Sequence, residues 1–182
     1  MTELEEIGIH INSIENTEQI ISQLMDNYSD DVLHLVFSYV KNRTTAEDLT
    51  QEIFIKCYEK LDQFNNKSSI KTWLYRIAIN HCKDYLGSWH YRKLNFNDKI
   101  WDYLPSKSKH VEEEVIAKDV ANSLMSAVMD LPVKYREVVF LHYYEELPLA
   151  NISKITGVNS NTLKTRLKQA RELLKNKMKK EV

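Results

Sequence analysis

The chain has 182 residues, with ten Tyr, five Phe and three Trp but only three Gly and three Pro, which favours an all-α protein because a multi-stranded sheet needs many turn residues. It has no apolar run of membrane-spanning length and no basic-then-apolar leader, so we expect a cytoplasmic protein without membrane insertion. Cys57 and Cys82 lack metal-ligand spacing, so we expect reduced thiols and neither a metal nor a cofactor. The net charge of −1 conceals an asymmetry: residues 1–40 hold no Lys or Arg, whereas residues 160–180 hold eight against one Glu. Such a basic segment is typical of nucleic-acid binding, but charge alone is equally compatible with a solvated helix end.

The first half of the chain carries four predicted helices. They cover residues 18–28, 31–41, 46–61 and 70–86. Residues 1–16 have weak periodicity, which indicates a flexible terminus. Thr45 and Asp48 have capping-box spacing at the start of the third helix. Serines of the polar loop 65–69 can cap the fourth helix, and Gly87 is expected to end it as glycine often does.

In the second half of the chain, the sequence pattern predicts a linker and a second set of helices. Residues 94–111 have no steady period and contain Pro105, so we expect a linker there. Helical periodicity resumes over residues 112–129 and 133–143. A short helix then begins at Pro148 and ends at Gly157, and a last helix begins after a cap at Asn159 or Ser160. The pattern predicts two small helical domains, residues 17–93 and 112–182, the second of them a helix-turn-helix.

The predicted helix over 46–61 has an unusual outer face. Its apolar stripe is formed by Leu49, Ile53, Cys57 and Leu61. The opposite face carries Asp48, Gln51, Glu52 and Ile55. An isoleucine among polar groups suits a docking surface for a protein partner. The alternative is that Ile55 packs against another helix of its own domain, and the pattern leaves both open.

The predicted helix over 70–86 is apolar around most of its circumference. One narrow polar stripe contains Thr72, Arg76, Asn80 and Lys83. Cations in this arrangement can contact phosphates, and an amide can read a base edge. The nearby aromatics Trp73, Tyr75 and Trp89 could stack on unpaired bases, although each of them taken singly fits a core residue better.

Residues 149–167 follow the pattern of a helix-turn-helix, with Gly157 at the turn and apolar Ile152, Val158 and Leu163 around it. On the second helix an outward basic stripe is formed by Lys164, Lys168, Arg171 and Lys175. Asn161, Thr165 and Gln169 lie beside it. This combination is typical of a helix that reads the major groove. An amphipathic terminal helix would explain the charges but not the preceding glycine turn.

Three segments together resemble the extracytoplasmic-function (ECF) family of RNA polymerase sigma factors. They are residues 46–58, 69–80 and 131–140, the last leading into the helix-turn-helix. The resemblance implies a protein that is not an enzyme, binds core RNA polymerase and directs promoter-specific initiation. It implies contacts with a coiled coil of the largest subunit and with the flap of the second-largest. It also implies a dedicated anti-sigma factor, often membrane-anchored, which could hold the protein at the inner face of the membrane.

The resemblance also assigns residues to three interfaces. Those expected to bind core polymerase are Asp48, Leu49, Gln51, Glu52 and Ile55. Those expected to bind the minus-ten element are Lys67, Lys71, Trp73, Arg76, Asn80, Lys83 and Trp89. Those expected to bind the minus-thirty-five element are Asn161, Thr162, Lys164, Thr165, Arg166, Lys168, Gln169, Arg171 and Lys175.

Two other classes of protein explain fewer of these features. A stand-alone helix-turn-helix regulator, whose N-terminal half senses a ligand or dimerises, leaves the polar face around Asp48 and the segment 73–80 unexplained. A helical metal-dependent hydrolase would need paired ligands, and the six histidines form no HExxH or comparable helical spacing.

Overall fold

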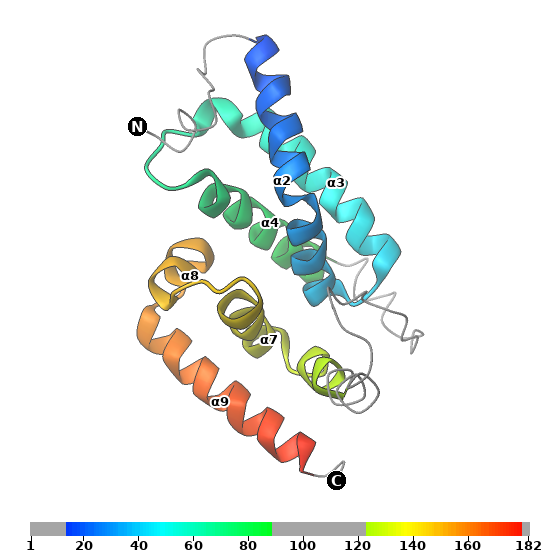
Figure 1. Ribbon diagram of the computed structural model, residues 1–182, viewed down its shortest axis with the longest axis vertical. Helices are drawn as coiled ribbons and strands as arrows, with labels where there is room; N and C mark the ends of the chain where they lie inside the picture. The colour runs from blue at the N-terminus through cyan, green and yellow to red at the C-terminus, as the bar shows by residue number, and fades with distance from the viewer. Residues whose placement is uncertain (1–13, 89–122, 180–182) are drawn as a thin grey trace, which may run out of the picture.

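The computed structural model describes residues 14–88 and 123–179, and all regular structure within those ranges is helical (Figure 1). The N-terminal group comprises α2 (Ile14–Val40), α3 (Arg43–Lys60), the short η1 (Leu61–Gln63) and α4 (Ile70–Gly87). The C-terminal group comprises a helical stretch over residues 123–129, α7 (Val133–Val139), the π-helix η2 (Phe140–Tyr144), α8 (Leu149–Thr156) and α9 (Ser160–Met178). The all-α prediction is confirmed. The predicted flexible terminus and linker, with Trp89, lie outside the described residues apart from 14–16.

The first two predicted helices form one continuous helix, α2, so the break expected between Tyr28 and Asp31 is wrong. The polar residues there lie among exposed or half-buried positions, while buried residues such as Leu24 and Val32 continue on either side. No glycine or proline interrupts the segment, so nothing breaks the backbone hydrogen bonds. The helix ends before Lys41, whose φ of +58° is left-handed.

The capping predictions at α3 and α4 had different outcomes. Asn42, not Thr45, caps α3: its Oδ1 accepts from the Thr45 backbone N–H at 2.9 Å, so the helix begins earlier than predicted. At α4 the expected serine cap is confirmed, because Ser69 Oγ accepts from the Thr72 N–H at 3.1 Å. The helix ends at Gly87 as predicted, but without the left-handed conformation that favours glycine there.

The C-terminal group turns as a helix-turn-helix. Gly157 has a φ of +72°, in the left-handed region that favours glycine. A Cβ at this position would meet no atom within 4 Å, so the backbone conformation, and not a lack of space for a side chain, explains the glycine. Asn159 caps α9 by accepting from the Asn161 N–H at 2.8 Å. The helix predicted over 133–143 is instead α-helical only to Val139 and continues as η2.

The two groups pack against each other rather than standing apart. Figure 1 shows α4 between the other N-terminal helices and the C-terminal group, with α9 on the outer side. The α4 helix packs against α8, and α2 packs against α7, so one hydrophobic cluster runs through both groups. Among the described residues, no helix combines the length and apolarity needed to cross a membrane.

Candidate nucleic-acid and polymerase interfaces

The outer face of α3 is solvent-exposed. Asp48, Gln51 and Glu52 are exposed, and the side chain of Ile55 is 58% exposed. This exposure excludes the alternative that Ile55 is buried against a helix of its own domain, and it leaves an apolar side chain ringed by polar groups. Leu49, in contrast, is only 4% exposed and packs in the core beneath this face.

A contact that the sequence did not indicate fixes this face to the next helix. The His81 Nε2 of α4 lies 2.7 Å from the Glu52 carboxylate of α3. The two residues are far apart in the sequence, and their pairing follows only from the packing of α3 on α4. This contact holds Glu52 at the edge of the exposed face.

The start of α4 and the loop before it enclose a hollow of about 380 Å³. It is lined by Gln63, Phe64, Asn65, Lys67, Ser68, Trp73, Arg76, Ile77 and Asn80. The Trp73 and Phe64 rings lie 5.4 Å apart at 54°, so they brace each other along one wall. Four of the residues predicted to bind minus-ten DNA thus share one concave site. Tyr75 is fully buried, which makes it a core residue and not a stacking surface.

Three cationic side chains predicted to bind minus-ten DNA form contacts with residues of the C-terminal group. Lys71 Nζ lies 3.1 Å from a Glu145 carboxylate oxygen, and Lys83 Nζ lies 2.9 Å from a Glu137 carboxylate oxygen. Arg76 donates from Nη2 to the Lys154 backbone carbonyl at 3.0 Å. The sequence did not indicate Glu137 of α7 or Glu145, the residue that follows η2, because both are remote in sequence from α4.

The two carboxylates also accept hydrogen bonds from buried tyrosines. Tyr39 donates to Glu137 at 2.5 Å, and Tyr75 donates to Glu145 at 2.7 Å. Burial, followed by the neighbouring glutamate, raises the pKa of each tyrosine above its ordinary value, so both hydroxyls remain protonated donors at neutral pH.

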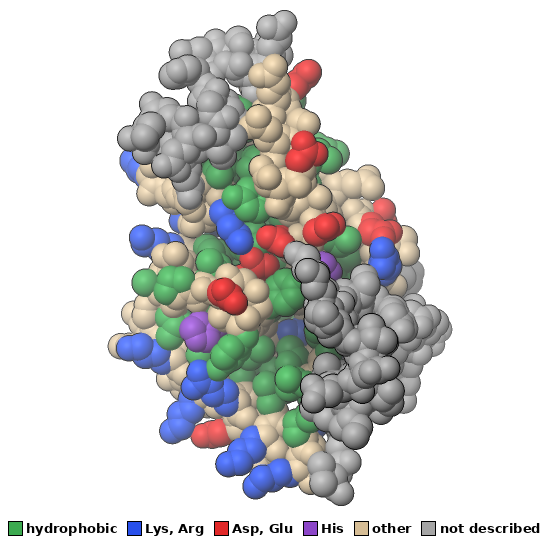
Figure 2. Space-filling view, in the orientation of Figure 1, with side chains coloured by type: hydrophobic (Ala, Val, Ile, Leu, Met, Phe, Trp, Pro, Cys, Tyr) green, Lys and Arg blue, Asp and Glu red, His purple; other side chains and the backbone are tan. Residues whose placement is uncertain are grey.

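The exposed side of α9 carries a basic surface, visible at the lower left of Figure 2. Leu163, Leu167 and Ala170 are buried against the rest of the C-terminal group. The exposed residues include Asn161, Thr162, Lys164, Thr165, Lys168, Gln169, Arg171 and Lys175. Arg166 differs from them, because it is half-buried and its guanidinium lies 3.8 Å from Glu137. The helix thus presents eight of its nine predicted DNA-binding residues to solvent.

Two tyrosines position polar groups on this surface. Tyr135 donates to the Gln169 side-chain carbonyl oxygen at 2.9 Å, which leaves the Gln169 amide N–H₂ available to an outside acceptor. Arg171 donates from Nε to the Tyr143 hydroxyl at 2.6 Å, and its guanidinium lies 5.6 Å from the Tyr143 ring centroid. These contacts restrict Gln169 and Arg171 to fewer rotamers than a free surface side chain would have.

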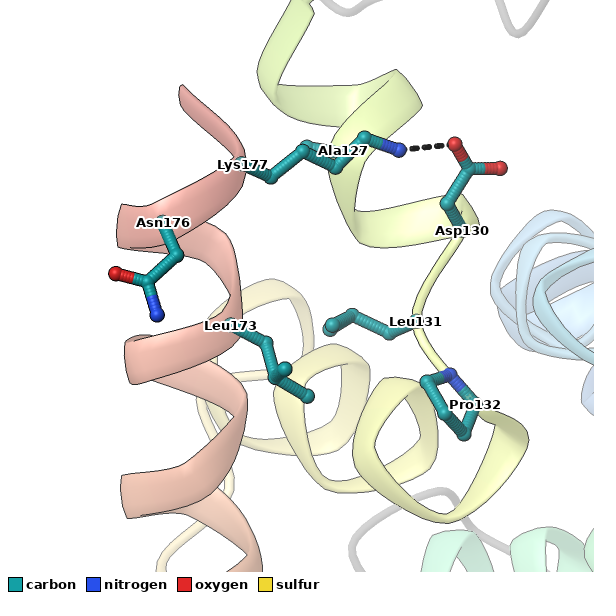
Figure 3. A pocket seen from close by; sticks show the side chains of 7 residues that line it. All are labelled: Ala127, Asp130, Leu131, Pro132, Leu173, Asn176 and Lys177. Atoms are coloured by element: carbon teal, nitrogen blue, oxygen red, sulfur yellow. Dashed lines mark hydrogen bonds and ion pairs between the residues drawn. The ribbon is translucent and has the colours of Figure 1, made fainter. Parts of the chain in front are cut away.

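The C-terminal group has a second hollow of about 300 Å³, shown in Figure 3. Leu131, Pro132, Ala127 and Leu173 form its apolar part, and Lys177 pairs with Asp130 at its edge. Exposed Leu124 and Met125 belong to the same helical stretch as Ala127.

Neither cysteine belongs to a reactive site. Cys57 and Cys82 are fully buried, and burial raises the pKa of each thiol to about 12. Within residues 14–88 and 123–179, no three His, Cys, Asp or Glu side chains are grouped so as to hold a metal ion.

Two family models match the chain, and together they cover most of it. The model described as Sigma-70 region 2 matches residues 24–90, and the model described as Sigma-70, region 4 matches residues 121–174. The RNA polymerase sigma factor SigV of Bacillus subtilis (strain 168) is 29% identical over 167 residues, covering 92% of this chain and 96% of SigV. The ECF RNA polymerase sigma factor SigM of the same strain is 30% identical over 156 residues, covering 85% and 93% respectively.

Solved structures show the same fold. The sigma factor RpoE of Bartonella quintana, in complex with the anti-sigma factor NepR, aligns with a TM-score of 0.69 over 87% of this chain and 96% of that one, at 21% identity. CnrH in complex with the cytosolic domain of CnrY aligns with a TM-score of 0.66 over 91% of each chain, at 18% identity. At these identities the likeness concerns the fold alone.

Proposed function

The chain belongs to the ECF group of the sigma-70 family of RNA polymerase sigma factors, and we propose that it divides promoter recognition between the α4 hollow and the basic surface of α9. It is an alternative sigma factor, so RNA synthesis itself stays with the polymerase. The observation that carries this proposal is that one chain bears two different candidate DNA surfaces, one concave and lined by an aromatic, the other convex and basic.

The α4 hollow suits an unpaired base of the minus-ten element. Its volume of about 380 Å³ leaves room for a planar ring, Trp73 and Phe64 offer apolar contact, and Asn80 offers an amide to a base edge. Exposed Lys67 can contact the adjoining phosphates. Unpairing a base costs a few kcal/mol, which stacking of about 1–3 kcal/mol per base can offset.

The α9 surface suits duplex DNA of the minus-thirty-five element. The residues near its start, Asn161, Lys164 and Thr165, are exposed and stand where a recognition helix reaches deepest into the major groove. Arg171 and Lys175 lie further along the helix, where the backbone phosphates pass. We assign base reading to the first set and positioning to the second.

Two further surfaces, outside the candidate DNA surfaces, are the candidates for binding core polymerase. The exposed face of α3, with Ile55 at its centre, is the candidate for the coiled coil of the largest subunit. The apolar hollow of Figure 3, with exposed Leu124 and Met125 nearby, is the candidate for the flap of the second-largest subunit.

We further propose control by an anti-sigma factor. Support comes from RpoE of Bartonella quintana, which was solved with the anti-sigma factor NepR and shares this fold over most of both chains. An anti-sigma factor anchored in a membrane would hold this protein at the inner face until a signal releases it.

A binding experiment tests the proposed function. Purified full-length chain is mixed with core RNA polymerase and separated by size-exclusion chromatography. We expect co-elution at one chain per polymerase. Absence of a stoichiometric complex would favour the stand-alone helix-turn-helix regulator, which has no need to bind the polymerase.

A further inference from the structure

The two helical groups are joined by a buried carboxylate that the proposed function does not use. The side chain of Glu137, on α7, is 2% exposed and contacts both groups. It accepts from Tyr39 of α2 at 2.5 Å and pairs with Lys83 of α4 at 2.9 Å. Beside it, Arg136 donates to the Tyr39 backbone carbonyl at 3.3 Å. Glu137 therefore ties α7 to two helices of the N-terminal group.

A second buried carboxylate makes the same kind of contact at the other end of the interface. The side chain of Glu145 is 3% exposed, accepts from Tyr75 at 2.7 Å and pairs with Lys71 at 3.1 Å. Between the two carboxylates, Arg76 donates to the Lys154 carbonyl of α8. Every one of these bonds joins the N-terminal group to the C-terminal group.

The cations held in this way belong to the candidate minus-ten surface. A carboxylate presents the same kind of anionic oxygen acceptor as a DNA phosphate, so Glu137 and Glu145 compete directly with a phosphate for Lys83 and Lys71. Arg76 also lines the α4 hollow, so its bond to Lys154 holds a wall residue of that site.

The packed arrangement cannot read both promoter elements at once. The centres of the two elements lie about 25 base pairs apart, which is roughly 85 Å at 3.4 Å per base pair. In the structure, however, α4 packs directly against α8, next to the recognition helix. The 34 residues between Ser88 and Ser123 could span about 110 Å if fully extended, so the chain length permits separation.

We propose that the free protein is closed by a carboxylate latch, Glu137 and Glu145, which occupies the minus-ten cations until loading on polymerase and promoter separates the two groups. This proposal rests on the proposed function, because it takes its minus-ten surface from there. The latch suits reversible opening, since burying ion pairs costs desolvation that largely offsets their attraction. In addition, Glu145 Oε1 has no hydrogen-bond partner among the described residues, so hydrogen bonds offset only part of the cost of removing this carboxylate from water.

Energy transfer between two labels on the full-length protein tests the latch. Cysteines introduced at exposed Asp84 and Glu172 carry the dyes, while Cys57 and Cys82 are buried and remain unlabelled. The test variants are Glu137→Gln and Glu145→Gln, which keep an acceptor oxygen for the tyrosine but remove the charge. The matched control is Glu146→Gln, which removes the same charge from an exposed residue.

A second readout is the affinity for a short fluorescent single-stranded DNA, measured by anisotropy. We expect high transfer in the parent and in Glu146→Gln, and lower transfer in both test variants. We also expect the test variants to bind the DNA about fivefold more tightly than Glu146→Gln, because a larger fraction of molecules is open. Circular dichroism establishes that each variant is folded.

Three results would overturn the latch: low transfer in the parent, unchanged transfer in both test variants, or lower transfer without a gain in DNA affinity over Glu146→Gln. Binding of the parent to core polymerase is measured in parallel without labels. Loss of that binding alone would count against the proposed function, while the energy-transfer result would still decide whether the protein is closed.

Discussion

In the function proposed above, Asn80 is the side chain on which base recognition in the α4 hollow would depend most. It is exposed, it lines the hollow together with Trp73, and its amide can donate and accept at the same time. Trp73 and Phe64 can hold any base by stacking, but they cannot distinguish one base edge from another. The sequence indicated Asn80 through its place on a polar stripe. It did not indicate the hollow beside Asn80, because residues of the loop at 63–68 line that hollow only in the folded protein.

We predict that Asn80→Ala lowers open-complex formation and weakens the preference for one minus-ten base by about 1–3 kcal/mol. The cause is the loss of a base-edge contact, so closed-complex binding should change much less. Permanganate footprinting on a matched promoter and on one with a single altered base measures the effect. Asn27→Ala, on the exposed side of α2, is the control. Equal losses on both templates would show that Asn80 does not read a base.

A charge reversal at Asp48 tests the proposed polymerase-docking face on α3. It is exposed on the same face as Ile55. We expect Asp48→Arg to weaken binding to core polymerase by about tenfold, or about 1.4 kcal/mol, because it reverses a charge within the contact. The same reversal at exposed Asp26 on α2 should leave the affinity unchanged. Helicity measured by circular dichroism should be unaltered in both, and equal affinities would refute the assignment of this face.

The turn between α8 and α9 depends on one backbone conformation. Gly157 and Gly87 both have open space where a Cβ would stand, but only Gly157 has a positive φ. We predict that Gly157→Ala lowers the free energy of unfolding by about 1–2 kcal/mol, whereas Gly87→Ala leaves it unchanged or raises it slightly. Urea denaturation of both variants compares them directly. Equal effects would mean that the left-handed turn contributes nothing to stability.

Along α9, a salt titration tests the proposed division between residues that read bases and residues that contact phosphates. Lys175→Ala should weaken binding to all minus-thirty-five sequences alike and reduce the salt slope by about one unit, because one phosphate contact is lost. Lys164→Ala should instead change which sequences are preferred. The measurement is binding to a small set of altered sites at several salt concentrations. The opposite pattern would mean that the helix lies in the groove the other way round.

At the level of helices, the apolar periodicity was sufficient for most elements, and local chemistry explains where it failed. The polar run from Asn27 to Asp31 resembled a break, but without glycine or proline it remained helical. Asn42 caps α3 in place of Thr45, because α3 already begins at Arg43 and the Asn42 side-chain oxygen accepts from the Thr45 backbone N–H. The π-helical turn at Phe140–Tyr144 has no distinct periodic signal, so the sequence predicted an ordinary helix there.

At the level of the whole molecule, the sequence predicted two sets of helices but not how they meet. Glu137 lies between Arg136 and Val138 in α7, and nothing near it in the sequence identifies Tyr39 and Lys83 as its partners. Glu145 likewise finds Tyr75 and Lys71 only through tertiary packing. The polar faces of α3, α4 and α9 were therefore predictable, whereas the packing that pairs Lys71 and Lys83 of α4 with buried carboxylates was not.

The most direct test of the central claim is transcription in vitro from a genomic library by core RNA polymerase with and without the purified chain, followed by mapping of the start sites. We predict discrete new start sites, each preceded by a common minus-ten and a common minus-thirty-five sequence at fixed spacing. Asn80→Ala should alter selection among the minus-ten sequences, and Lys164→Ala among the minus-thirty-five sequences. The same start sites with and without the chain, or new start sites that share no paired motif, would contradict the account.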